Sequence, residues 1–183
     1  MKLFNLAIAV LLPLILFAPA LGAESRPNII LIMADDIGYE CFGCYGSEQY
    51  STPHIDRMAK QGMRFTHCYS QPLCTPSRIK IMTGISNVRN YSGFSILNSD
   101  QRTIGQYFQD AGYDTLVAGK WQLLGAEHYP EQFRLKGSWP EQTGFDRICL
   151  WLVDKLVSRF WQRLLYIDGE NRLFGSKTQY GPE

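Results

Sequence analysis

A single thiol stands beside a proline and a fixed positive charge in the stretch QPLCTPSRIK, which runs from residue 71 to residue 80. Cys74 is followed by Pro76 two positions later and by Arg78 four positions later, which is one turn along a helix. A guanidinium in that place can hold an anion or stabilise a thiolate. Isolated cysteines are more often packing residues, so the motif by itself leaves a structural role open.

Two adjacent carboxylates and a lysine end other apolar segments of the chain. Asp35 and Asp36 follow one such segment, and Lys120 closes another. Adjacent carboxylates repel each other unless a cation neutralises them, and hard oxygen ligands suit calcium or magnesium. A turn-capping aspartate and a solvated lysine are the plain alternatives. Together with Cys74 and Arg78, however, these residues are suited to handling a tetrahedral anion such as sulfate or phosphate.

The elements that must position these residues alternate between strand and helix patterns. We expect strands over residues 27–36, 63–71 and 114–120, and helices over residues 51–62, 75–84 and 99–113. The last of these helices carries a capping box, Thr103 with Gln106. Residues 121–145 are loop-like, and residues 149–165 have helical spacing, although 148–153 also suit a strand. The alternation predicts an α/β fold with a mostly parallel sheet, in which the carboxyl ends of the strands face the ligand.

The N-terminus reads as a secretory signal peptide, residues 1–23, with one lysine, an apolar run and small residues ending at Ala23. The run is interrupted by Pro13 and is short for a membrane span, which needs about 20 residues. We therefore expect no stable membrane anchor, and a mature chain of residues 24–183 that is periplasmic or secreted.

The bulk composition fits an ordinary globular domain. The 183 residues carry a net charge of +1, which gives no sign of a nucleic-acid partner. The five cysteines are an odd number, so at least one is unpaired in any intrachain scheme. Cys41 and Cys44 form a lone C-x-x-C, which we expect in a loop as free thiols or a disulfide.

Three segments, in order, resemble the sulfatase family in its arylsulfatase branch: PNIILIMADDIGYECFGCYG, TPHIDRMAKQGMRFTHCYSQPLCTPSR and TIGQYFQDAGYDTLVAGKW. The C-x-P-x-R motif is specific when an Asp-Asp pair precedes it and Gly-Lys-Trp follows it. The resemblance, from residue 27 to residue 145, implies an alkaline phosphatase-like sulfatase fold, with a mostly parallel central sheet flanked by helices. It also implies a sulfuric ester hydrolase, of which residues 24–183 would be the N-terminal portion of the catalytic domain.

The resemblance further implies a role for each candidate residue. Cys74 would be oxidised to formylglycine, the nucleophile, by a formylglycine-generating enzyme. Arg78 would hold the hydrated aldehyde, and Lys120 would contact the sulfate of a small sulfate ester or a sulfated glycan. Asp35, Asp36 and residue 74 would bind calcium, or magnesium in its place.

The sequence departs from the family pattern in two ways. Most relatives have histidine where this chain has Gln122, which can contact sulfate but cannot move a proton at neutral pH. The family's later Asp-Asn metal pair, histidine and second lysine are missing from these 183 residues, so we expect little activity from the chain as it stands.

Two other functions stay open at this point. One is hydrolysis of phosphate esters by the same superfamily, although phosphatases of this kind use threonine or serine as the nucleophile. The other is a non-catalytic exported protein that binds anions or glycans.

Overall fold

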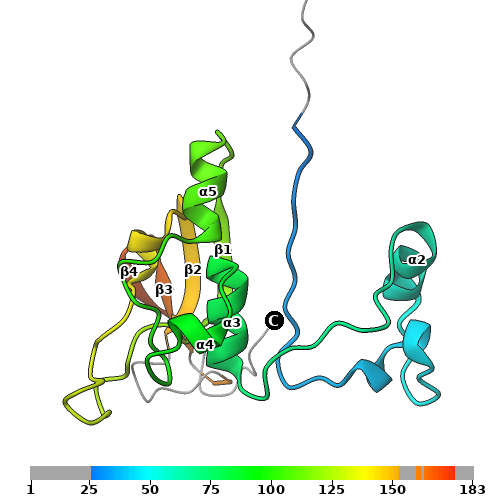
Figure 1. The fold of residues 1–183 in the computed structure, drawn as a ribbon, viewed down its shortest axis with the longest axis horizontal. Coiled ribbons are helices and arrows are strands. Elements are labelled where there is room, and N and C mark those ends of the chain that lie inside the picture. The colour runs from blue at the N-terminus through cyan, green and yellow to red at the C-terminus, as the bar shows by residue number, and fades with distance from the viewer. Residues whose placement is uncertain (1–25, 153–159, 162, 176–183) are drawn as a thin grey trace, which may run out of the picture.

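The computed structural model describes residues 26–152, 160–161 and 163–175, so the predicted signal peptide lies outside the described residues. The described chain contains one four-stranded sheet in the order β1-β2-β3-β4. The helices of residues 74–83, 87–90 and 104–110 lie beside the sheet, whereas the helix of residues 53–61 lies apart from it (Figure 1). The strands are β1 Leu116–Trp121, β2 Arg147–Leu152, β3 Arg163–Ile167 and β4 Glu170–Phe174. The α-helices are α2 Pro53–Gln61, α3 Cys74–Thr83, α4 Asn87–Asn90 and α5 Ile104–Asp110. Short 3₁₀ turns are η1 Tyr39–Cys41, η2 Gly43–Tyr45 and η3 Pro140–Thr143.

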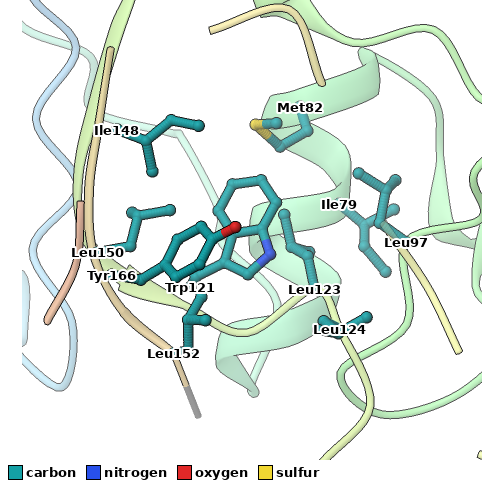
Figure 2. Close-up of a cluster of buried hydrophobic side chains, with 10 residues drawn as sticks. All are labelled: Ile79, Met82, Leu97, Trp121, Leu123, Leu124, Ile148, Leu150, Leu152 and Tyr166. Atoms are coloured by element: carbon teal, nitrogen blue, oxygen red, sulfur yellow. The ribbon is translucent and has the colours of Figure 1, made fainter. Parts of the chain in front are cut away.

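The sheet is mixed. β1 and β2 are parallel, whereas β2 pairs antiparallel with β3, and β3 forms an antiparallel hairpin with β4. Alternate residues of β2 face the core, so Ile148, Leu150 and Leu152 are buried. They belong to the same cluster as Ile79 and Met82 of α3, which Figure 2 shows. The α/β class expected from the sequence is confirmed.

Helix α3 is the element that positions the C-x-P-x-R motif. It begins at Cys74, with Leu73 as its N-cap, and ends at Thr83. Gly84 is its C-cap, and its φ of 68° is the left-handed conformation that glycine adopts without strain. The hydroxyl of Ser77 accepts from the backbone N–H of Gln71 at 2.9 Å and donates to the carbonyl of Leu73 at 3.1 Å. These bonds fix the segment that leads into the helix.

Several other expectations are confirmed. Helix α2 lies within residues 51–62 and ends before Gly62, and β1 occupies the third predicted strand. Helix α5 has the predicted capping box, in which Thr103 Oγ1 accepts from the N–H of Gln106 and Gln106 Oε1 accepts from the N–H of Thr103.

The sequence predicted a buried strand over residues 27–36, and the structure contradicts this prediction. The segment is extended, but within the described chain it joins no ladder, and Ile30 and Ile32 are 84% and 81% exposed. It is held near its two ends, where Arg26 Nη1 donates to Gly112 O at 2.9 Å and Asp35 contacts Lys120. An apolar run becomes a strand only where another backbone pairs with its N–H and C=O groups, and no described strand does so here.

Two further element predictions are wrong. Residues 63–71, expected as a strand, are irregular and almost entirely exposed. A helix was expected over residues 149–165, but the described part of this range belongs to strands β2 and β3. Residues 153–159 and 162 lie outside the described chain. The alternation of buried and less buried residues in β2 has a period of two, so the strand alternative was the right one.

Candidate active site

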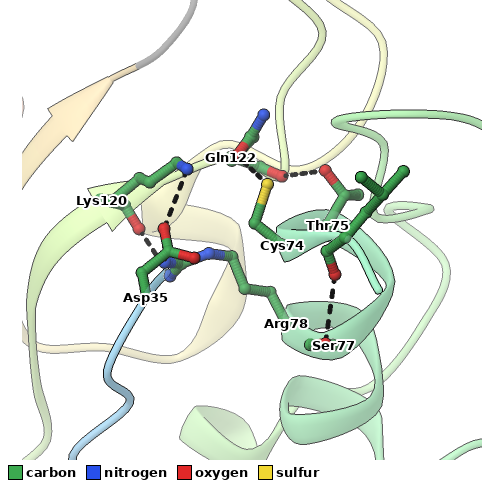
Figure 3. A network of polar contacts seen from close by, with 8 residues as sticks. Asp35, Cys74, Thr75, Ser77, Arg78, Lys120 and Gln122 are labelled. Carbon is green, nitrogen blue, oxygen red and sulfur yellow. Dashed lines mark hydrogen bonds and ion pairs between the residues drawn. The ribbon is translucent and has the colours of Figure 1, made fainter. Parts of the chain in front are cut away.

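Four elements bring the predicted site residues together. Cys74 opens α3, Lys120 lies near the end of β1, Gln122 follows that strand, and Asp35 ends the extended N-terminal segment (Figure 3). The thiol of Cys74 donates to Oε1 of Gln122 at 2.8 Å. Gln122 is only 5% exposed, so this amide has little access to water.

Two cations converge on one oxygen of Asp35. Lys120 Nζ lies 2.9 Å from Asp35 Oδ2, and Arg78 Nη2 lies 3.2 Å from the same atom. Arg78 Nη1 also donates to the carbonyl of Lys120 at 2.9 Å, which joins α3 to β1. Burial raises the pKa of Asp35, but the hydrogen bonds and charges of Lys120 and Arg78 outweigh it, so this pKa lies below its usual value.

One nitrogen of the Arg78 guanidinium, Nε, makes no hydrogen bond among the described residues. The Arg78 side chain is 15% exposed, and its Nε is buried. A buried N–H that lacks a partner costs free energy, and a site that binds an oxyanion can supply that partner. The guanidinium therefore holds Asp35 with one nitrogen and keeps another available.

Asp36 does not join this arrangement. It is exposed and has a φ of 58°, a left-handed conformation that aspartate tolerates better than most residues. Within the described residues, no group of three or more His, Cys, Asp or Glu side chains is placed to hold a metal ion. Calcium prefers 6–8 oxygen ligands. One carboxylate oxygen of Asp35, Oδ2, is already in contact with the two cations Lys120 and Arg78. The described residues by themselves therefore do not fit a calcium ion.

Sequence reasoning missed a polar connection on the other side of residue 74. Thr75 Oγ1 donates to the carbonyl of Gln122 at 3.5 Å and accepts from the N–H of Ser95 at 3.1 Å. Ser95 Oγ lies 3.2 Å from the hydroxyl of Tyr129. Nothing in the spacing of these residues marks them, because Ser95 and Tyr129 lie in loops that only the fold brings to α3.

Comparison with known proteins finds a match to the sulfatase family model over residues 27–163. The chain is 41% identical over 147 residues to human steryl-sulfatase, which covers 73% of this chain and 25% of that protein. It is 37% identical over 132 residues to the arylsulfatase of Klebsiella aerogenes, covering 64% and 28% respectively. The chain thus spans roughly a quarter of the length of these relatives.

Solved structures agree in fold. One of them, an enzyme in complex with its substrate D-glucosamine-2-N,6-O-disulfate, superposes with a TM-score of 0.68 at 32% identity, covering 82% of this chain and 28% of that one. Another, in complex with k-i-k-neocarrahexaose, gives a TM-score of 0.67 at 26% identity, covering 83% and 38%.

No helix among the described residues is both long and apolar enough to cross a bilayer. The family model extends over most of the chain and takes in Asp35, the C-x-P-x-R helix and the strand that carries Lys120. The two curated relatives are a steryl-sulfatase and an arylsulfatase. This chain belongs to the sulfatase family.

Proposed function

We propose that this chain carries the nucleophile and part of the anion-binding site of a sulfuric ester hydrolase. The observation that supports it most is the convergence of Lys120 and Arg78, from two different elements, on one oxygen close to residue 74. Cations that are held in place before the substrate binds stabilise the negative charge of a bound sulfate. They also stabilise the charge that develops while the sulfate group is transferred. Family membership favours sulfate as the anion.

In this proposal, a formylglycine-generating enzyme oxidises Cys74 to formylglycine, with molecular oxygen as the oxidant. One hydroxyl of the hydrated aldehyde attacks sulfur, the S–O bond to the alcohol breaks, and the alcohol leaves with a proton. The second hydroxyl then loses its proton and collapses to the aldehyde, which breaks the C–O bond to sulfate and releases it. The amide of Gln122, which accepts from the thiol at 2.8 Å, is placed to accept from a hydroxyl of residue 74. Arg78 Nε, which has no partner among the described residues, is a donor for an oxygen of the hydrate or of sulfate. Lys120 Nζ donates to a sulfate oxygen. Gln122 orients these groups and carries no proton between them.

Calcium is implied by the family, but the described residues do not fit it by themselves, and no step is assigned to it. The role that the geometry supports for Asp35 is different. Its carboxylate fixes the positions of Lys120 and Arg78 through contacts of 2.9 and 3.2 Å. Asp36 is exposed and takes no part in these contacts.

The proposal extends to the setting of the enzyme. Residues 1–23 would direct export to the periplasm or the medium, and residues 24–183 would belong to the sulfatase catalytic domain. A formylglycine-generating enzyme would act on Cys74. A sulfated sugar is the substrate class that the structural relatives favour, since one was solved with D-glucosamine-2-N,6-O-disulfate as its substrate.

The test is the chemical state of residue 74 after co-expression with a formylglycine-generating enzyme. The tryptic peptide that holds Cys74 should lose one sulfur and two hydrogens and gain one oxygen. The same tryptic peptide, residues 65–78, also holds the exposed Cys68, which lies outside the motif and is the internal control. Fragmentation of the peptide should place the mass change at position 74 and leave the thiol of Cys68 intact. A thiol retained at position 74, while the same modifying enzyme converts a known sulfatase in parallel, would overturn the proposal.

Anion titrations distinguish this proposal from the two alternatives, a phosphate ester hydrolase and a non-catalytic anion-binding protein. Tighter binding of phosphate than of sulfate to the modified chain would favour a phosphate ester hydrolase. Binding of sulfate to a chain that keeps the thiol would favour a non-catalytic anion-binding protein.

A further inference from the structure

Thr75 comes directly after the nucleophile position, and the C-x-P-x-R motif leaves its identity open. The motif fixes residues 74, 76 and 78 and sets no side chain at position 75. Thr75 is nevertheless fully buried in the first turn of α3. A buried hydroxyl needs hydrogen-bond partners, because a buried polar group without them costs free energy. The contacts of this hydroxyl in the folded chain therefore explain the residue better than the motif does.

The hydroxyl of Thr75 connects α3 to the loop that follows β1. Its Oγ1 accepts from the N–H of Ser95 at 3.1 Å and donates to the carbonyl of Gln122 at 3.5 Å, which is long for a hydrogen bond. Gln122 also accepts from the thiol of Cys74, through Oε1, at 2.8 Å. Two consecutive residues of α3 thus contact the backbone and the side chain of the same glutamine (Figure 3).

The segment of residues 95–97 supports this connection from a second direction. All three of its residues are buried. The N–H of Leu97 donates to the carbonyl of Leu123, in the loop after β1, at 3.0 Å. Ser95 has a φ of 61°, a left-handed conformation that is uncommon outside glycine and persists where surrounding contacts enforce it. The segment therefore binds Thr75 at one end and the loop after β1 at the other, and holds the two together.

We infer that Thr75 is a positioning residue, which sets the distance between residue 74 and the amide of Gln122. The inference rests on the proposed function, in which this amide accepts from a hydroxyl of the hydrated formylglycine. Hydration adds water across the aldehyde, so that the water oxygen bonds to the carbonyl carbon and one proton moves to the carbonyl oxygen. The aldehyde has no hydroxyl to donate to Oε1 of Gln122, so the hydrogen bond favours the hydrate. A glutamine held in place by Thr75 therefore keeps residue 74 in the form that attacks sulfur.

The test uses the full chain, labelled with ¹³C at the Cβ of cysteine and converted at residue 74 by a formylglycine-generating enzyme. The aldehyde carbon and its hydrate give separate NMR signals, whose intensities give the ratio of the two forms. Thr75→Val keeps the branched side chain and the motif but removes the hydroxyl. It should lower the ratio of hydrate to aldehyde by about two- to tenfold, the range for one net hydrogen bond. Thr75→Ser retains a hydroxyl and should keep the native ratio.

Two further variants separate positioning from a general loss of structure. Thr83→Val makes the same substitution at the other end of α3, where the hydroxyl donates to the carbonyl of Ile79 at 2.7 Å, and it should leave the ratio unchanged. Gln122→Leu removes the acceptor itself and should lower the ratio as Thr75→Val does. In the Gln122→Leu background, Thr75→Val should have no further effect, because substitutions that act through one contact are not additive.

The outcomes distinguish this inference from the function on which it rests. If residue 74 keeps its thiol while the same enzyme converts a known sulfatase in parallel, the proposed function and the inference both fail. If residue 74 is converted and Thr75→Val has the native ratio, Thr75 is a packing residue and the inference alone is overturned. Equal falls in Thr75→Val and Thr83→Val would overturn it too, because they would report a loosened helix. An unchanged ratio in Gln122→Leu would overturn it whether or not Thr75→Val folds.

Discussion

The thiol of Cys74 and the amide of Gln122 meet at 2.8 Å, although the two residues lie 48 positions apart. The contact joins the start of α3 to the loop that follows β1, and the glutamine is buried. A buried amide holds its neighbour in place at every pH, because it has no proton to gain or lose near neutrality. Anion binding at this site should therefore lack the pH dependence that an imidazole would give.

Gln122→His should introduce that pH dependence. Sulfate affinity of the native chain should be flat between pH 5.5 and pH 8, values chosen to bracket the ordinary histidine pKa of about 6.5. In the variant, affinity should rise as the pH falls through that region, because the imidazolium adds a positive charge. Isothermal titration at several pH values measures it, with Gln132→His as the exposed control. A variant with a flat profile would show that position 122 does not face the anion.

Arg78→Ala should weaken sulfate binding far more than Arg89→Ala. Arg78 is mostly buried and reaches Asp35 and the carbonyl of Lys120, whereas Arg89 is an exposed residue of α4. Hydrogen bonds to charged groups are worth about 1.5–3 kcal/mol, so the loss should be roughly 10- to 100-fold. Arg78→Lys should recover part of it, since lysine keeps the charge but not the forked geometry. Equal losses in the two alanine variants would remove any special role for the motif arginine.

Lys120→Ala should tighten calcium binding. In the native chain, Asp35 is neutralised by two cations and no described cluster completes a cage, so the dissociation constant should be about millimolar, as in the weakest calcium modules. Removal of one cation frees negative charge beside Asp36. Calorimetric titration of residues 24–183 gives the comparison, and Lys60→Ala, on the exposed face of α2, should change nothing. Micromolar binding by the native chain would contradict the ligand count.

Asp146→Asn should lower the free energy of unfolding near neutral pH. It should also make that free energy fall less steeply as the pH drops into the acid range. The backbone N–H and then the hydroxyl of Thr115, with the amide of Gln109, hold the pKa of Asp146 below its usual value. A lowered pKa contributes stability that is complete above the unfolded-state pKa of about 3.9 and is lost as the pH falls through the folded-state value. The asparagine variant has no charge to lose there.

Urea unfolding midpoints at pH 7 and pH 3 provide the measurement for this carboxylate. The difference in urea midpoint between native and Asp146→Asn protein should be clear at pH 7 and smaller at pH 3. The exposed Asp100→Asn variant should not differ from native at either pH. A constant difference at both pH values would mean that the carboxylate acts through shape and not through charge.

The sequence predicted which candidate residues lie near one another better than it predicted the sheet, and the roles of these residues stay a prediction. The order of the Asp-Asp pair, the C-x-P-x-R helix and the lysine predicted that Asp35, Arg78 and Lys120 would meet, because strand ends and helix starts gather at one edge of an α/β sheet. The helix ends were also predictable, since capping and stop signals such as Thr103, Gln106 and Gly84 act over a few residues.

The misplaced elements depended on partners distant in the chain. Residues 27–36 have the composition of a buried strand, yet composition does not supply the backbone that must pair with them. Residues 149–165 satisfy a helical and an alternating pattern over their first part, and packing of Leu150 against the core decided for the strand. Ser95 and Tyr129 were invisible for the same reason, because their connection to Thr75 of α3 comes from loop paths that no local signal encodes.

The extended segment with Ile30 and Ile32 open to water bears on how this protein must be handled at the bench. Six residues from Asn28 to Met33 have high β-propensity, no charge and no proline, which is the signature of an aggregation-prone window. Purified material should turn cloudy as its concentration is raised, and should stay clear longer when Ile30 is replaced by lysine. A stock that precipitates in this way would owe its turbidity to the six residues 28–33, while the helix that bears Cys74 is still folded.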